Sequence, residues 1–471
     1  MDRFGLELED VCSGIFAFGT TGSGKTSVLR LLMDDIVNTP FQRHYRGPVQ
    51  AVAGLWCCVK KDEADNALAV LGHTGMRDRV QHLVPGHFTF NFVSYLLNEQ
   101  EGGNPAALAR LLEKLNKQLN NASQGGNNEQ FWAALFFDYL HYGIWVAWLA
   151  YRNDVSLEHI YDVITSCPTS LDHANSEQFK ASPCWRTLQL ADKNVRSDAE
   201  DRALFKAGEF FLFRQSVLGD AARGAGLQMA SSVLSPFLIS PIYETVCANT
   251  SSFRPEMALR DYWCIIDAPI LVHKQGGMLF SSLLTMLVQD AALRRSNPDT
   301  ICAIVRDEVQ FLVADIEHES MVQSVCRSSM LAHISAAQNI PLLQAASGGD
   351  HRAETLVRAL LANYRTKLLL ANICDATNRM CSDMQGEFKD KFFSISEGPK
   401  DPNDLLGSIL GMKPLQMSMS EQLHKRLPPE NFLTLRRGGQ AFNYLIDAYL
   451  MIGGHTFADG LPFKKVTFSQ R

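Results

Sequence analysis

Residues 13–26 read SGIFAFGTTGSGKT, and this stretch decides the fold. A short apolar run leads into a glycine-rich loop, and residues 27–37 then carry apolar side chains at helical spacing. The order of strand, glycine-rich loop and helix is typical of a unit that binds phosphate at a helix N-terminus. We therefore expect a βα unit here, with the loop at the carboxyl end of the strand.

The loop itself, residues 19–26, matches the pattern G-x-x-x-x-G-K-[ST]. Glycines at 19, 22 and 24 allow the backbone to wrap closely, so that its N–H groups can point at phosphate oxygens. Lys25 would reach the β- and γ-phosphates of ATP, and Thr26 would offer its hydroxyl to Mg²⁺. The residues expected to contact the nucleotide are Gly19, Thr20, Thr21, Gly22, Ser23, Gly24, Lys25, Thr26 and Ser27.

Further apolar runs predict the rest of a parallel α/β sheet. Before residue 98 they are residues 49–59, which end in Lys60-Lys61-Asp62, and residues 87–93. A helix is expected at residues 278–295. The later candidate strands are residues 262–266, 301–305, 331–336, 367–371 and 441–449. A doubly wound sheet of this kind would place its ligand at the carboxyl ends of the strands.

Two acids follow one of these strands, in the sequence ICAIVRDEVQ of residues 301–310. Asp307 would hold Mg²⁺, and Glu308 would orient and deprotonate the water that attacks the γ-phosphate. An acidic turn after a strand is common by itself. Together with the upstream phosphate loop, however, the pair predicts the second half of an ATPase site.

Two further residues are candidates for catalysis. Gln338 ends the strand in LAHISAAQN and could sense phosphate or position water, although a polar strand end is an ordinary feature. Arg327 precedes that strand and could be an arginine finger, within its own subunit or into a neighbour, or only a surface charge. Arg365 is a second candidate for the same role.

Composition limits the other possibilities. The chain has 471 residues, 46% of them hydrophobic and 20% charged, as in an ordinary globular protein. Its net charge of −6 means that any contact with nucleic acid must come from a local patch. The eleven cysteines form no CxxC pair and the histidines show no HExxH spacing, so we predict no metal beyond Mg²⁺.

Residues 98–257 show mostly helical periodicity. We predict a motor domain formed by residues 1–97 and 258–471, and a helical insertion at residues 98–257. Residues 131–151 (FWAALFFDYLHYGIWVAWLAY) raise the question of a membrane span. Asp138 and His141 near the middle of this segment favour a helix buried in the protein.

Several of these segments together resemble the HerA/FtsK superfamily, and within it the TraD/TraG-like coupling proteins of conjugation and type IV secretion. They are GTTGSGKT, IIDAP at 265–269, VRDEVQF at 305–311, SAAQN at 335–339 and FLTLRRGGQAFNYLIDAYLMIGG at 432–454. The similarity covers about residues 15–93 and 262–471. The resemblance implies a RecA-like fold of the additional-strand class with ATP and Mg²⁺ as cofactors, and it places Lys25, Thr26, Asp307, Glu308 and Gln338 on the family's motif positions.

The resemblance also implies a homo-hexameric ring that moves single- or double-stranded DNA through a central channel. Relaxosome or secretion-channel proteins would be its partners. Coupling proteins carry transmembrane helices before the phosphate loop, whereas only about fourteen residues precede the first strand here. We expect a cytoplasmic protein, a shortened form, or one whose membrane anchor is a separate subunit. A HerA-type motor of DNA processing or defence, and a nucleotide-gated scaffold that moves no DNA, remain alternatives.

Overall fold

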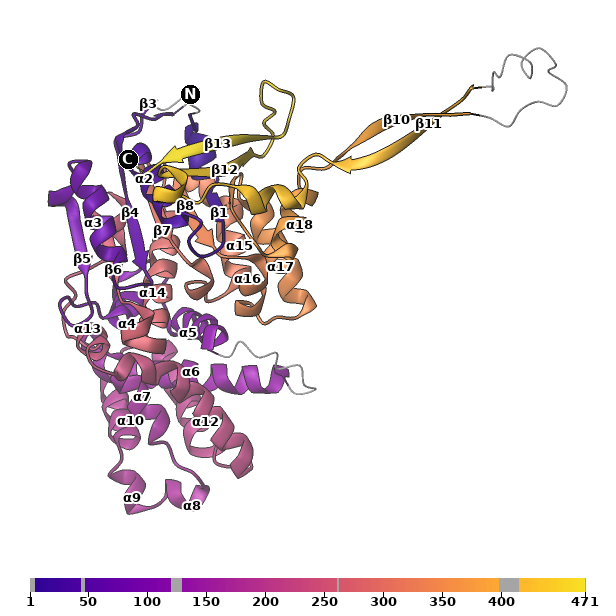
Figure 1. The fold of residues 1–471 in the computed structure, drawn as a ribbon. Coiled ribbons are helices and arrows are strands. Elements are labelled where there is room, and N and C mark those ends of the chain that lie inside the picture. The colour runs from indigo at the N-terminus through magenta and orange to yellow at the C-terminus, as the bar shows by residue number, and fades with distance from the viewer. Residues whose placement is uncertain (1–4, 44–46, 120–128, 261, 398–414, 471) are drawn as a thin grey trace, which may run out of the picture.

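A nine-stranded sheet forms the centre of the molecule in the computed structural model, which describes residues 5–43, 47–119, 129–260, 262–397 and 415–470 (Figure 1). The strand order is β13-β12-β9-β1-β8-β7-β4-β6-β5. Neighbouring strands from β9 to β5 are parallel, and β12 is antiparallel to both β9 and β13. The strands are β1 (Ile15–Phe18), β4 (Ala51–Cys58), β5 (Val80–Leu83), β6 (Trp263–Asp267), β7 (Thr300–Arg306), β8 (Leu331–Ala337), β9 (Thr366–Leu370), β12 (Leu445–Ile452) and β13 (Phe463–Ser469).

Both faces of the sheet are covered, which explains why its central strands read as unbroken apolar runs. In β7, Ile301, Ala303 and Val305 pack with α2 (Lys25–Asn38) and α3 (Glu63–His73) on one face. Cys302 and Ile304 point to the other face, where α14 (Ile270–Leu293) packs. The arrangement confirms the predicted α/β class with a mainly parallel, doubly wound sheet.

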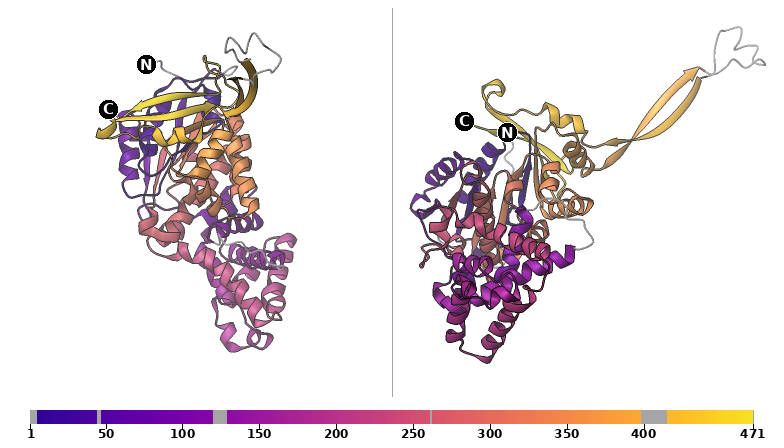
Figure 2. Two further views of the ribbon diagram at one scale, coloured as in Figure 1. Left: turned by 45° about the vertical axis from the view of Figure 1, so that its right-hand side comes forward. Right: turned by 90° about the horizontal axis from the view of Figure 1, so that it is seen from below.

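Helices fill the rest of the molecule. Every element that the structure describes between residues 92 and 259 is helical, and this part lies at one end of the sheet (Figures 1 and 2). Its α-helices are α4 (Phe92–Ser94), α5 (Pro105–Leu119), α6 (Glu129–Tyr151), α7 (Leu157–Thr165), α8 (Leu171–Ala174), α9 (Glu177–Lys180), α10 (Pro183–Asn194), α11 (Asp198–Glu209), α12 (Asp220–Leu234) and α13 (Ile242–Val246). Near the sheet lie α15 (Ile316–Val325), α16 (Ile340–Ala346), α17 (His351–Asn363) and α18 (Asp375–Asp383).

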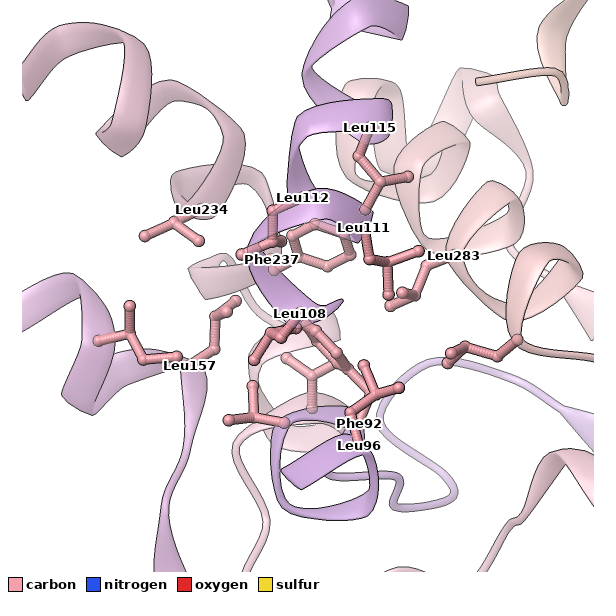
Figure 3. Close-up of a cluster of buried hydrophobic side chains, with 14 of the residues drawn as sticks. Phe92, Leu96, Leu108, Leu111, Leu112, Leu115, Leu157, Leu234, Phe237 and Leu283 are labelled. Atoms are coloured by element: carbon pink, nitrogen blue, oxygen red, sulfur yellow. The ribbon is translucent and has the colours of Figure 1, made fainter. Parts of the chain in front are cut away.

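The helical part shares its hydrophobic core with one face of the sheet. Figure 3 shows leucines of α5 surrounded by side chains from α7, α12 and the turn after α12, together with Leu283 of α14. The same buried cluster continues to Cys302 and Ile304 of β7. No separate core therefore marks a boundary between the helices and this face of the sheet.

The apolar segment at residues 131–151 lies within α6, which packs against α5, α7, α10, α11 and α12. Asp138 forms an ion pair with Arg214 at 3.6 Å, and the ring of His141 stacks on that of Phe137. Among the described residues, only α14 is both long and apolar enough to cross a membrane, and most of that helix is buried.

One predicted strand was wrong, and a predicted helix and another predicted strand are present with different bounds. Residues 87–93 form no strand: the third strand of the chain's first part is β5, a short, partly exposed edge strand without a strong apolar run. The phenylalanines at 88, 90 and 92 pack into the core from a loop and a short helix. The helix expected from residue 278 begins at Ile270 and kinks at Lys274, where φ is 51°. The last predicted strand begins at Leu445, and residues 440–442 form a 3₁₀ turn.

A buried polar network lies beneath the carboxyl end of β7. The Arg306 guanidinium binds both carboxylate oxygens of Glu319, at 2.8 and 3.0 Å. Gln289 donates to Glu319 and contacts His333, whose other ring nitrogen lies 2.6 Å from Gln323 Oε1. Burial disfavours the charge of Glu319, but the adjacent Arg306 holds the pKa of that carboxyl at about 2. We call these five residues the interior cluster.

A two-stranded antiparallel ribbon projects from the body next to α18 (Figures 1 and 2). It consists of β10 (Glu387–Glu397) and β11 (Leu415–Lys425), and the sequence did not lead us to expect it. Phe393 pairs with Met419 and Ile395 with Met417 across the ribbon, so these four exposed side chains share one face. The ribbon thus carries an apolar face outside the body of the protein.

Candidate functional site

The phosphate loop connects the end of β1 to the first turn of α2. Gly22 and Gly24 have φ of 75° and 93°, backbone conformations that a side chain disfavours. A Cβ at Gly24 would also lie 2.5 Å from Ile446 Cδ1 of β12, and one at Gly19 would lie 2.3 Å from Ser23 Oγ. All three glycines are therefore required by the shape of the loop, as the sequence pattern predicts.

Lys25 is buried at the start of α2 and binds the loop that it follows. Its Nζ donates to the carbonyl oxygens of Gly19 at 2.8 Å and Thr20 at 3.4 Å. Burial lowers the pKa of Lys25, and the carboxylates of Glu308 and Asp307 partly oppose that shift. The ammonium is thus positioned inside the loop, where phosphate oxygens could replace the two carbonyl oxygens as acceptors.

The acid pair lies directly beside this loop. Thr26 donates its hydroxyl hydrogen bond to Asp307 Oδ2, and Asp307 Oδ1 accepts the backbone N–H of Glu308 at 3.1 Å. A threonine hydroxyl and one carboxylate are hard oxygen ligands of the kind that Mg²⁺ uses beside nucleotide phosphates. Among the described residues, no group of three or more His, Cys, Asp or Glu side chains could hold a metal ion. Because both are single oxygen donors, Thr26 and Asp307 suit an ion that completes its shell with phosphate and water.

Glu308 is the most heavily bonded member of the site. Its side chain is buried, and its backbone adopts a left-handed conformation with φ of 57°. Oε1 accepts from Lys60 Nζ at 3.0 Å and from Gln338 Nε2 at 3.2 Å, whereas Oε2 accepts from Gln310 Nε2 at 2.8 Å. Burial opposes ionisation, but the bond from Gln310, the charge of Lys25 and the other two donors leave the pKa of Glu308 below its ordinary value. The carboxylate is therefore kept charged.

Lys60, Glu63 and Gln310 belong to this site, and the sequence did not single them out for it. Lys60 follows β4, the strand next to β7. Its position directly after a buried parallel strand could have marked it in the sequence as a candidate site residue. Glu63 Oε2 accepts the backbone N–H groups of Val59 and Lys60 at 2.6 and 3.2 Å, which fixes this turn. Burial and the charge of Asp307 raise the pKa of Glu63 to about 7.

The structure does not bring Arg327 to this site. The residue lies just before β8, at the amino edge of the sheet, whereas Gln338 follows the same strand at the carboxyl edge. A strand rises by about 3.3 Å per residue, so the seven residues of β8 separate these two edges by roughly 20 Å. Arg327 is exposed and forms an ion pair at 3.5 Å with Glu9, which also pairs with Arg365. An action of Arg327 within its own subunit is thus excluded by distance in this conformation.

The remaining predicted contacts lie around the loop. Ser27 Oγ accepts a hydrogen bond from Gln470 at 2.9 Å, and the Thr20 backbone N–H donates to Ala371 at 3.0 Å. Thr21 is exposed and Ser23 is buried. We call the residues that converge at the carboxyl edge the edge cluster: Lys25, Thr26, Lys60, Asp307, Glu308, Gln310 and Gln338.

The fold and site together define a class of protein. The strand β8 lies between β1, which carries the phosphate loop, and β7, which carries the acid pair. A strand inserted at this position, with Gln338 at its end, is the arrangement of RecA-like P-loop folds of the additional-strand class. We identify the fold of this chain as a member of that class.

Among solved structures, the chain has the fold of the bacterial conjugative coupling protein TrwB. The unbound form of that protein matches with a TM-score of 0.56 and 14% identity over 98% of this chain and 86% of the other. Its complex with ADP and Mg²⁺ gives the same TM-score, identity and coverage. Its complex with a non-hydrolysable ATP analogue gives 0.55 and 15% identity over 98% and 87% of the two chains. No family model and no curated protein matches the sequence.

Proposed function

We propose that this protein is a Mg²⁺-dependent ATPase that moves DNA, as a transfer-coupling motor of a conjugative or type IV secretion-like system. The observation that carries the proposal is the convergence of Lys25, Thr26, Asp307, Glu308 and Gln338 at one sheet edge, from three strand ends. The similarity of the fold to TrwB supports the choice of a DNA motor among the many functions of P-loop folds.

The chemistry follows from the side chains present. Lys25 would exchange its two carbonyl partners for β- and γ-phosphate oxygens. Thr26 and Asp307 would hold Mg²⁺, which neutralises phosphate charge when bound. Water would attack the γ-phosphorus while the bond to the ADP oxygen breaks, and Glu308 would take the proton of that water. Gln338 lies beside Glu308, where its amide could contact either the water or the phosphate.

The intact acid pair separates this proposal from a nucleotide-gated scaffold. A protein that only binds ATP has no need for a buried carboxylate that is kept ionised beside the phosphate loop. Glu308 is such a carboxylate, and its burial is costly unless it serves a function. Hydrolysis is therefore the activity that the site supports best.

The test compares Lys25→Ala with the matched control Lys61→Ala, which removes an exposed lysine outside the edge cluster. Nucleotide binding and phosphate release are measured with Mg²⁺, and with no DNA, single-stranded DNA or double-stranded DNA. We expect wild type and the control to hydrolyse ATP faster with DNA, and Lys25→Ala to lose both binding and turnover. Turnover that no DNA stimulates would contradict the DNA motor and favour another P-loop activity, and nucleotide binding without turnover would favour the scaffold.

A further inference from the structure

Lys60 occupies an unusual position for an exposed lysine. Its backbone is fixed by Glu63 at the end of β4, and about half of its side chain is exposed. Its Nζ nevertheless reaches inward to Oε1 of the buried Glu308, at 3.0 Å. Because the backbone of Lys60 is fixed while its side chain is flexible and half-exposed, the ammonium can move without any change in the sheet.

This ion pair conflicts with the role of Glu308 as a base. An ionised carboxylate offers about four lone-pair positions, and Lys60, Gln338 and Gln310 fill three of them. A cation in direct contact also stabilises the charged carboxylate and weakens it as a proton acceptor. Departure of Lys60 from Oε1 would therefore free a second acceptor position of Glu308 for the attacking water.

The geometry also shows where the ammonium would go. Lys60 and Gln338 bind the same oxygen of Glu308, so their head groups are neighbours. Gln338 follows β8, between the phosphate loop and the acid pair, on the side where a terminal phosphate would lie. A γ-phosphate carries more negative charge than one carboxylate and would attract the ammonium toward that side.

We propose that Lys60 is a phosphate-contacting residue within the same subunit, paired with Glu308 when no γ-phosphate is present and transferred to the γ-phosphate when ATP binds. The transfer adds positive charge where it develops in the transition state and frees Oε1 of Glu308 for water. This inference rests on the proposed function, since it requires ATP at the loop. It concerns a different cation from Arg327, which could act only from a neighbouring subunit.

The test uses Lys60→Met, which keeps the length of the side chain without its charge, and Lys60→Arg, which keeps the charge. Lys61→Met is the matched control. Affinities for ADP and for a non-hydrolysable ATP analogue are measured with Mg²⁺, together with kcat and KM for ATP. We expect Lys60→Met to bind ADP as wild type does, to lose about tenfold in affinity for the analogue, and to lose about 10²-fold in kcat. Lys60→Arg should recover part of both losses.

A lysine that only held Glu308 in place would give a different pattern. Its removal would leave the ratio of analogue to ADP affinity unchanged, and turnover would stay constant or rise because Glu308 would be a stronger base. Either result would overturn the inference. Lys25→Ala, measured alongside, keeps the two proposals apart: if it binds nucleotide as wild type does, the proposed function fails and the role of Lys60 fails with it. If only Lys25→Ala is defective, the proposed function stands and the Lys60 inference alone is wrong.

Discussion

The edge cluster and the interior cluster lie side by side at the end of β7, yet their buried carboxylates are paired in opposite ways. Glu319 meets the whole fork of Arg306, and its further partner Gln289 is also buried. Glu308 is equally buried but shares one oxygen between a half-exposed lysine and Gln338. A charge that is fully paired within the protein serves structure, whereas one that is held by exchangeable partners is available for chemistry.

The largest effect on turnover is expected from a test of whether each cluster is complete within one chain. Both carboxylate oxygens of Glu319 in the interior cluster are paired within one chain, whereas we propose that a neighbour's arginine in a ring completes the edge cluster. We expect Arg327→Ala to lose about 10³–10⁵ in turnover if Arg327 is that arginine. Mixing inactive Arg327→Ala with inactive Lys25→Ala should then restore part of the activity, because some junctions pair an intact loop with an intact arginine.

The measurement is phosphate release as a function of total protein concentration and mixing ratio. Arg327→Ala should fold normally, since an exposed ion pair such as Arg327–Glu9 contributes less than about 1 kcal/mol. Specific activity that does not depend on concentration, with no rescue on mixing, would show that Arg327 supplies nothing across a junction.

Glu308→Gln should separate chemistry from binding at the edge cluster. The amide cannot accept the proton of water, so we expect turnover to fall by about 10²–10⁴ while nucleotide binding is kept. Binding is measured with the non-hydrolysable analogue and turnover by phosphate release. Glu317→Gln makes the same chemical change at an exposed glutamate of α15 and should behave as wild type. Near-normal turnover of Glu308→Gln would remove this residue from the catalytic role.

Glu319→Gln should act on folding instead. It leaves the Arg306 charge buried without its partner, and we expect a loss of about 3–5 kcal/mol in the free energy of unfolding at pH 7. The double variant Arg306→Met/Glu319→Leu removes both charges and should cost much less. Denaturant unfolding of the three proteins provides the measurement. Equal losses in the single and double variants would mean that packing, not the ion pair, stabilises this region.

Acid should reduce the difference in the free energy of unfolding between wild type and Glu319→Gln. The folded pKa of Glu319 is about 2, below its ordinary 4.5, so its contribution is full above pH 4.5 and disappears as pH falls toward 2. The glutamine variant has no such group to protonate, so its stability should fall less over this window.

The sequence revealed most of the edge cluster because its chemistry is local. Residues 19–26 and the pair Asp307-Glu308 follow strongly apolar strands, and the strand order then brings them together. Lys60 could not be recognised in the same way, since a lysine after a strand has no motif and its partner Glu308 is 248 residues away. The sequence alone could have placed Arg327 away from the phosphate loop, because a residue that precedes a parallel strand lies at the opposite edge of the sheet.

The fold was predicted where burial leaves a clear pattern and missed where it does not. The central strands, buried on both faces, were found within a few residues. The edge strand β5 is half-exposed, so its four residues carry no distinctive apolar run. The β10–β11 ribbon pairs two segments that are separated by 17 residues in the sequence, and its apolar face has no core to define it. Partial burial therefore weakens the sequence pattern of a strand more than distance from the nucleotide site does.

The strand order also determines when the sheet can form as the chain leaves the ribosome. None of the first three sheet strands pairs with another of them: β1 lies between β8 and β9, β4 between β7 and β6, and β5 beside β6. Their partners are synthesised only after the helical residues, and β1 waits for Leu331 and beyond. Such non-local pairing is slow and leaves apolar strand edges open to aggregation meanwhile. The nascent chain should therefore need protection by chaperones until β9 has emerged, long after the phosphate loop itself has been made.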